Sequence, residues 1–130
     1  FSPASVPARP RPLERARLRR LACFISLPRM VIAPSLLAAN FGRLADDTRR
    51  AEKSGAEWLH LDIMDGHFVQ NISFGPAVVK TLRPLSKMFF DVHLMCSRPE
   101  ILLEPFARAG AGQITIHVEL QERVAPLLLK

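Results

Sequence analysis

Histidines and carboxylates recur along this chain at a spacing of two residues. Three such pairs occur: His60 with Asp62, Asp91 with His93, and His117 with Glu119. Side chains two positions apart on a strand point to the same face, so each pair converges if its segment is a strand. Imidazole nitrogens and carboxylate oxygens together suit Zn²⁺, Fe²⁺, Mn²⁺ or Co²⁺. A single histidine at a strand end is more often a hydrogen-bonded structural residue, but three in register favour one divalent metal ion as a cofactor.

Other kinds of chemistry have little support in the sequence. It contains no glycine-rich phosphate loop, no G-x-S-x-G and no paired-cysteine metal motif. We interpret Cys96 as a buried, inert thiol and His67 as a structural or surface residue. On pattern alone, Met64 and Met95 are core residues, and Ser35 is a polar residue at the end of a strand.

The elements that would position these pairs alternate between strand and helix. The apolar runs predict strands over four ranges: 31–36, 57–62, 88–94 and 113–118. Asn40 is predicted to cap the first helix, Gly75-Pro76 begins a short second helix, and Ser97-Arg98-Pro99-Glu100 is a capping box that begins a third. This alternation predicts a parallel sheet with helical crossovers. In barrels built this way, polar residues at the C-terminal ends of strands are typical of catalytic groups.

The positive charge of the chain is confined to its N-terminal segment. The net charge is +6, and residues 1–29 alone hold seven arginines and one glutamate, so the remainder is neutral. The folded part therefore gives no electrostatic reason to expect nucleic acid as a partner. Because five prolines lie among these arginines, we expect residues 1–29 to be a disordered extension and residues 30–130 to form the domain. An organelle-targeting peptide is the alternative for the extension.

Cysteine usage and hydropathy bear on the compartment. The two cysteines, Cys23 and Cys96, fall one in each part of the chain, which does not suggest a disulfide framework. A reducing, cytoplasmic location is predicted, or an organelle if the extension is a transit peptide. The longest apolar stretch near the N-terminus, residues 21–27, is far shorter than the roughly 20 residues of a spanning helix, so no membrane partner is expected.

Four blocks of this sequence resemble the ribulose-phosphate 3-epimerase family. APSLLAANF at 33–41 is similar to the family's opening strand and loop, and WLHLDIMDGHFV at 58–69 to its most distinctive block. NISFGP at 71–76 continues that block, and DVHLM at 91–95 resembles the third-strand motif. The resemblance extends from about residue 31 to residue 120 without an insertion. It implies the N-terminal half of a (β/α)₈ TIM barrel of the ribulose-phosphate-binding type, with four βα units present.

The resemblance also implies roles for individual residues. Asp62 matches a residue that is both a metal ligand and one of two acid/base carboxylates, and His60 and His93 match metal ligands. The substrate-contacting positions would be Ser35, His93, Met64 and Met95. His117 and Glu119 match no ligand of the family, which weakens the metal role that their spacing alone suggests.

The implied activity is that of a metal-dependent isomerase of the pentose phosphate pathway. It interconverts D-ribulose 5-phosphate and D-xylulose 5-phosphate through a metal-stabilised enediolate, and a homo-oligomer is expected for the full-length protein. The family's second carboxylate and its phosphate-binding glycines lie in the other half of the barrel, so we expect this chain to be inactive alone. The alternatives are an allulose-phosphate epimerase, a hexulose-phosphate synthase, or a non-catalytic truncated half-barrel.

Overall fold

A three-stranded parallel sheet forms the centre of the part of the chain that the computed structural model describes, residues 30–129. Its strands are β1 (Trp58–Met64), β2 (Phe89–Met95) and β3 (Gln113–Thr115), in the order β1-β2-β3. The expectation of a parallel sheet is confirmed, and the first two strands lie within two residues of their predicted bounds. β3 is shorter than predicted, because the chain leaves the sheet after Thr115.

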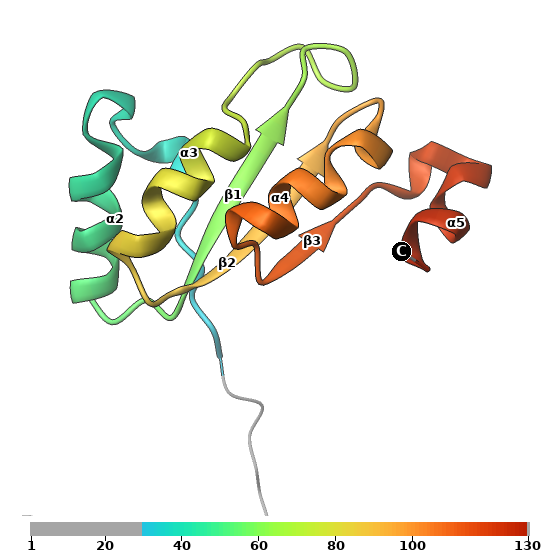
Figure 1. The fold of residues 1–130 in the computed structure, drawn as a ribbon. Coiled ribbons are helices and arrows are strands. Elements are labelled where there is room, and N and C mark those ends of the chain that lie inside the picture. The colour runs from blue at the N-terminus through green and yellow to red at the C-terminus, as the bar shows by residue number, and fades with distance from the viewer. Residues whose placement is uncertain (1–29, 130) are drawn as a thin grey trace, which may run out of the picture. The chain divides into compact units, whose positions relative to one another are not determined.

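Helices cover one face of this sheet (Figure 1). In β1 the odd-numbered residues are buried and the even-numbered ones are half-buried. In β2 this pattern is inverted, except that Phe89 at its start is exposed. The buried set packs against α3 (Pro76–Leu82) and α4 (Leu103–Ala109), chiefly through Val79 and Phe106, both fully buried. The strands therefore have an apolar face under the helices and a second face that carries the polar residues.

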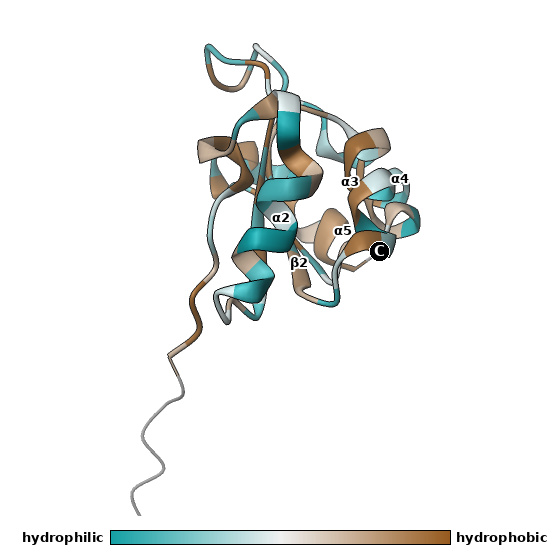
Figure 2. Cartoon of the chain, turned by 90° about the vertical axis from the view of Figure 1, so that its left-hand side faces the viewer, coloured by the Kyte–Doolittle hydropathy of each residue, from teal (hydrophilic) through white to brown (hydrophobic). Residues whose placement is uncertain are grey.

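Helix α2 (Leu44–Lys53) lies beside α3 and is amphipathic. Most of its charged residues are exposed, as the hydrophilic colour along its visible side shows (Figure 2). Thr48 in contrast is fully buried and donates a hydrogen bond to the carbonyl of Leu44. The predicted cap is confirmed in part, because Asn40 accepts a hydrogen bond from the backbone N–H of Gly42. It caps a 3-10 helix, Phe41–Arg43, which leads into α2.

The predicted strand at 31–36 is wrong in extent. Only Ser35 forms a bridge, a parallel one to His60, and only one ladder hydrogen bond is made, from the N–H of His60 to the carbonyl of Pro34. Pro34 has no N–H to donate, so the ladder cannot continue through it. A 3-10 helix, Leu36–Ala38, follows at once. Four βα units were predicted, and three of them have a regular strand.

The predicted capping box at 97–100 is also wrong. Ser97 caps no helix; its N–H and hydroxyl both donate to the Asp65 carboxylate, 2.7 Å away in each case. The chain instead enters a 3-10 helix, Pro99–Ile101, before α4 begins. Gly110 ends α4 in the left-handed conformation, with φ 101°, which glycine adopts without steric cost.

The remaining helices are short. They are the 3-10 helices Arg83–Leu85 and Val118–Arg123 and the α-helix α5 (Val124–Leu128). Among the residues that the structure describes, no helix is long and apolar enough to cross a bilayer. The prediction that residues 1–29 are disordered falls on residues outside the described range.

Candidate functional site

The polar face of the sheet brings the predicted residues together at the C-terminal ends of β1 and β2. Residues facing each other across these strands include Asp62 and His93, and Met64 and Met95. Because neighbouring parallel strands end at the same edge of the sheet, residues about 30 positions apart in the sequence become neighbours in space. His60 lies one step below Asp62 on the same face.

Three potential ligand atoms converge on this face. His60 Nε2 lies 3.0 Å from Asp62 Oδ1, and His93 Nδ1 lies 3.2 Å from the same oxygen. One ligand atom from each of the three residues lies within 4.8 Å of the other two. All three side chains are partly buried, with exposed fractions of 28% for His60, 14% for Asp62 and 23% for His93. The residue types, distances and partial burial fit a divalent transition-metal ion.

Ser35 fixes the other oxygen of Asp62. Its hydroxyl donates a 2.6 Å hydrogen bond to Asp62 Oδ2, across 27 positions of sequence. Burial raises the pKa of the Asp62 carboxyl, but the hydrogen bond from Ser35 and the neighbouring imidazoles of His60 and His93 lower it more, so the net shift of this pKa is downward. Asp62 is thus held ionised, as a metal ligand or a general base requires.

Each of the two histidines contacts a second partner on its other nitrogen. His60 Nδ1 lies 2.8 Å from Asp91 Oδ2, and Gln113 Nε2 donates to Asp91 Oδ1 at 2.8 Å. His93 Nε2 lies 2.7 Å from His117 Nε2. His117 Nδ1 in turn lies 3.3 Å from Glu119 Oε2, although this carboxylate is 64% exposed. The third predicted pair therefore supports His93 from outside the cluster of ligand atoms.

Other residues singled out in the sequence fall in different surroundings. Met64 and Met95 are half-buried on the polar face, one step beyond Asp62 and His93. His67 is exposed in the loop after β1, as predicted. Cys96 is buried, and burial together with the nearby Asp65 charge raises the pKa of its thiol to about 11, which agrees with an inert role.

Asp65 ties the loop after β1 to the loop after β2. Its Oδ1 accepts hydrogen bonds from the N–H groups of His67 and Phe68, and its Oδ2 accepts both from Ser97. Burial opposes ionisation, but these four donors outweigh it and hold the pKa of the carboxyl far below its ordinary value. Sequence reasoning missed this residue, because its partner Ser97 lies 32 positions away.

We expect Asp65→Asn to lower the free energy of unfolding by about 1 kcal/mol at neutral pH, because an amide nitrogen would face the N–H of Ser97. The pKa of the Asp65 carboxyl is lower in the folded than in the unfolded state. Its ionised form therefore stabilises the fold above about pH 4, and this stabilisation is lost as the pH falls below that value. Urea titrations at pH 7 and pH 3, at one protein concentration, should therefore show a smaller difference between the two proteins at pH 3. An equal difference at both values would contradict this assignment.

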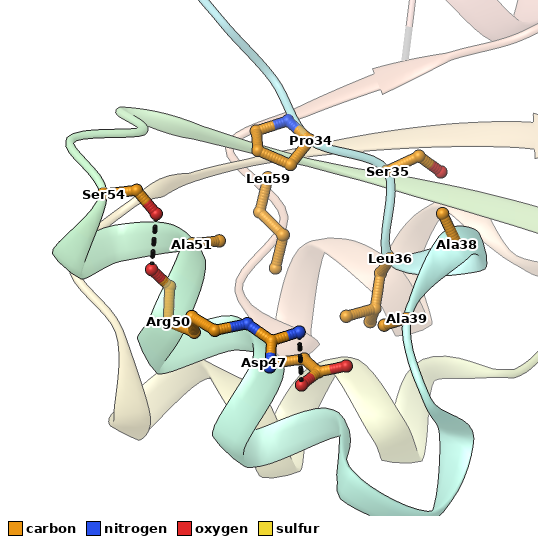
Figure 3. A pocket seen from close by; sticks show the side chains of 10 residues that line it. All are labelled: Pro34, Ser35, Leu36, Ala38, Ala39, Asp47, Arg50, Ala51, Ser54 and Leu59. Atoms are coloured by element: carbon orange, nitrogen blue, oxygen red, sulfur yellow. Dashed lines mark hydrogen bonds and ion pairs between the residues drawn. The ribbon is translucent and has the colours of Figure 1, made fainter.

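A pocket of about 280 Å³ lies between the 34–39 segment and α2 (Figure 3). Its polar groups are already paired: Arg50 binds Asp47 at 3.1 Å, and the Ser54 hydroxyl donates to the carbonyl of Arg50. The pocket shares Ser35 with the polar cluster but includes neither histidine. We therefore place the functional site at the cluster on the polar face.

A partial parallel α/β barrel with a histidine–aspartate cluster at its strand ends is the class of protein that the fold and the site define. The family model of the ribulose-phosphate 3 epimerase family matches residues 31–129. The chain therefore belongs to this family, whose members are isomerases that act on carbohydrates and have the TIM-barrel type of fold.

Curated relatives agree with this assignment. The chain is 50% identical over 90 residues to a ribulose-phosphate 3-epimerase of Synechocystis, with 69% of this chain and 39% of the relative covered. It is 47% identical over 89 residues to the cytoplasmic isoform of rice, covering 68% and 39%. It is 42% identical over 95 residues to the chloroplastic enzyme of Arabidopsis, covering 73% and 34%. The chain thus spans well under half the length of these relatives, which occur in more than one compartment.

Proposed function

We propose that this chain supplies the metal-binding strands of a ribulose-phosphate 3-epimerase, which interconverts D-ribulose 5-phosphate and D-xylulose 5-phosphate. The observation that carries the proposal is the convergence of His60, Asp62 and His93 on one face of a sheet whose family is that of such epimerases. The cytoplasm remains the predicted compartment, and full-length homo-oligomers remain a prediction.

Asp62 is proposed as one of the two groups that move the proton at C3 of the substrate. Its carboxylate is ionised, partly buried and held on one oxygen by Ser35, so that its orientation is fixed before the substrate binds. Inversion needs a second acid/base group on the opposite side of the carbon, and we propose that this group comes from the other half of the barrel, as the family resemblance implies.

His60, Asp62 and His93 are proposed to hold one divalent ion, Zn²⁺, Fe²⁺, Mn²⁺ or Co²⁺. When bound, such an ion would polarise the carbonyl next to C3 and offset the negative charge that develops on its oxygen. Met64 and Met95 lie at the ends of their strands beside this cluster, where their apolar side chains would exclude water without offering a competing acid.

The proposed centre predicts a specific pattern of metal affinity. Isothermal titration of the chain with Zn²⁺ should give one site, and His60→Ala or His93→Ala should each weaken it by more than about 100-fold, since each removes a ligand. His67→Ala is the matched control, because this histidine lies in an exposed loop, and it should leave the affinity unchanged. Equal affinity in the chain and in His60→Ala would show that the ligand assignment is wrong.

A further inference from the structure

Asp91 stands out among the residues around the cluster because both of its oxygens have a partner on a neighbouring strand. The three residues His60, Asp91 and Gln113 face one another in register across β1, β2 and β3. Asp91 Oδ2 lies 2.8 Å from His60 Nδ1, and Asp91 Oδ1 accepts from Gln113 Nε2 at 2.8 Å. The Asp91 side chain is 13% exposed, so water competes little for these oxygens.

The contact with Asp91 favours one tautomer of His60 once a metal occupies the cluster. Both ring nitrogens lie beside a carboxylate oxygen, Nδ1 at 2.8 Å from Asp91 Oδ2 and Nε2 at 3.0 Å from Asp62 Oδ1. When Nε2 and Asp62 Oδ1 both bind an ion, Nε2 must present its lone pair, so the proton lies on Nδ1, from which the Asp91 carboxylate accepts a hydrogen bond. Gln113 prevents the Asp91 carboxylate from turning away, because its amide donates to the second oxygen.

The support on His93 is of a weaker kind. Its outer nitrogen contacts His117, and an imidazole can either donate or accept, so this contact alone does not fix the tautomer of His93. The carboxylate behind His117, that of Glu119, is 64% exposed and lies at 3.3 Å. The stronger constraint on the cluster is therefore the one that Asp91 applies to His60.

We propose that Asp91, held by Gln113, is a positioning residue that fixes the tautomer and ring orientation of His60 for metal binding. The inference rests on the metal centre proposed above and adds a residue that neither binds the ion nor touches the substrate. Residues that hydrogen-bond to a metal ligand without binding the metal typically contribute about 10–100-fold to metal affinity, and we expect a contribution in this range from Asp91.

The test uses the whole chain titrated with Zn²⁺ and the variants Asp91→Ala and Asp91→Asn. Zn²⁺ affinity should fall about 10–100-fold in Asp91→Ala and by a smaller factor in Asp91→Asn, whose amide oxygen can still accept from His60 Nδ1. The matched control is Asp46→Ala, which removes a carboxylate that is 56% exposed and pairs only with arginines on the surface, and it should bind as the unsubstituted chain does.

A spectroscopic readout separates positioning from general stability. In the Zn²⁺-loaded chain, long-range ¹H–¹⁵N correlation spectra should show His60 protonated at Nδ1 with a slowly exchanging proton. That signal should persist in Asp91→Asn and be lost in Asp91→Ala.

Unchanged affinity and an unchanged His60 signal in Asp91→Ala would overturn the positioning role alone. If Asp91→Ala does not fold, a His60 without an Nδ1 proton in Asp91→Asn or in the unsubstituted chain would overturn it. If instead His60→Ala binds as tightly as the unsubstituted chain, the proposed metal centre itself is wrong.

Discussion

Asp62→Asn should lower epimerase turnover by about 10²–10⁴-fold, the usual contribution of a general acid or base. The asparagine can still accept from Ser35 and can act as a weak ligand, but it cannot take a proton from carbon. The measurement needs a complete barrel, so we would use a chimera in which residues 30–129 replace the matching segment of the Synechocystis relative. A coupled assay of xylulose 5-phosphate formation gives kcat and KM for both proteins.

Two controls isolate the role of Asp62 in that chimera. Asp46→Asn removes an exposed carboxylate on α2 and should leave turnover unchanged. Metal content, measured on each purified protein, distinguishes loss of the ion from loss of the base. Near-normal kcat in a metal-loaded Asp62→Asn chimera would remove this residue from proton transfer, whatever its role as a ligand.

The convergence of His60, Asp62 and His93 could be predicted because a strand repeats every two residues, whereas the family resemblance, not the spacing, set His117 and Glu119 apart. His60 and Asp62 had to share a face of β1, and His93 had to follow on β2 at the same edge of the sheet. Asp91 was visible in the same pattern, since it lies two residues before His93. Its contact with His60 was not predicted, because this depends on the register between β1 and β2, which the spacing within one strand does not give.

The errors in the predicted fold have local causes. The segment at 31–36 reads as an apolar strand, but Pro34 cannot donate to a ladder, and one bridge at Ser35 is what remains. Ser97 satisfies the spacing of a capping box, yet it binds Asp65 instead. Ser97 binds a carboxylate 32 positions away in the sequence rather than the nearby helix end. A pattern of neighbouring residues contains no information about such a distant partner.

The 130-residue chain is expected to show no measurable epimerase activity by itself. It spans 39% of the Synechocystis relative, whereas a complete barrel of this type needs eight βα units and roughly 200 residues or more. Inversion at C3 requires proton transfer on two faces of the carbon, and Asp62 can serve one of them. The substrate's phosphate would also lack its usual site, which in such barrels is formed by the loops after the seventh and eighth strands.

We also expect this chain to self-associate. β3 and the Ser35 segment each pair along one side only within residues 30–129, and unpaired strand edges template association. Apolar side chains are exposed as well, including Phe89 at 37% and Val118 at 78%. Light scattering after size exclusion should therefore show dimers or larger assemblies, and a monomer at micromolar concentration would contradict this expectation.

The assay of the purified chain should be run beside the chimera, at equal concentrations of protein and Zn²⁺. Activity of the chimera would show that residues 30–129 can take part in catalysis. Inactivity of the chain alone could then be attributed to the groups that it lacks. Turnover by the chain within tenfold of the chimera would contradict the prediction. It would mean that two copies assemble into a working barrel, or that a residue within the chain serves as the second acid/base group. Mixing Asp62→Asn with the unsubstituted chain in the active assembly would then distinguish these cases. Independent sites make activity fall in proportion to the fraction of the variant, whereas sites shared between copies make it depart from that proportion.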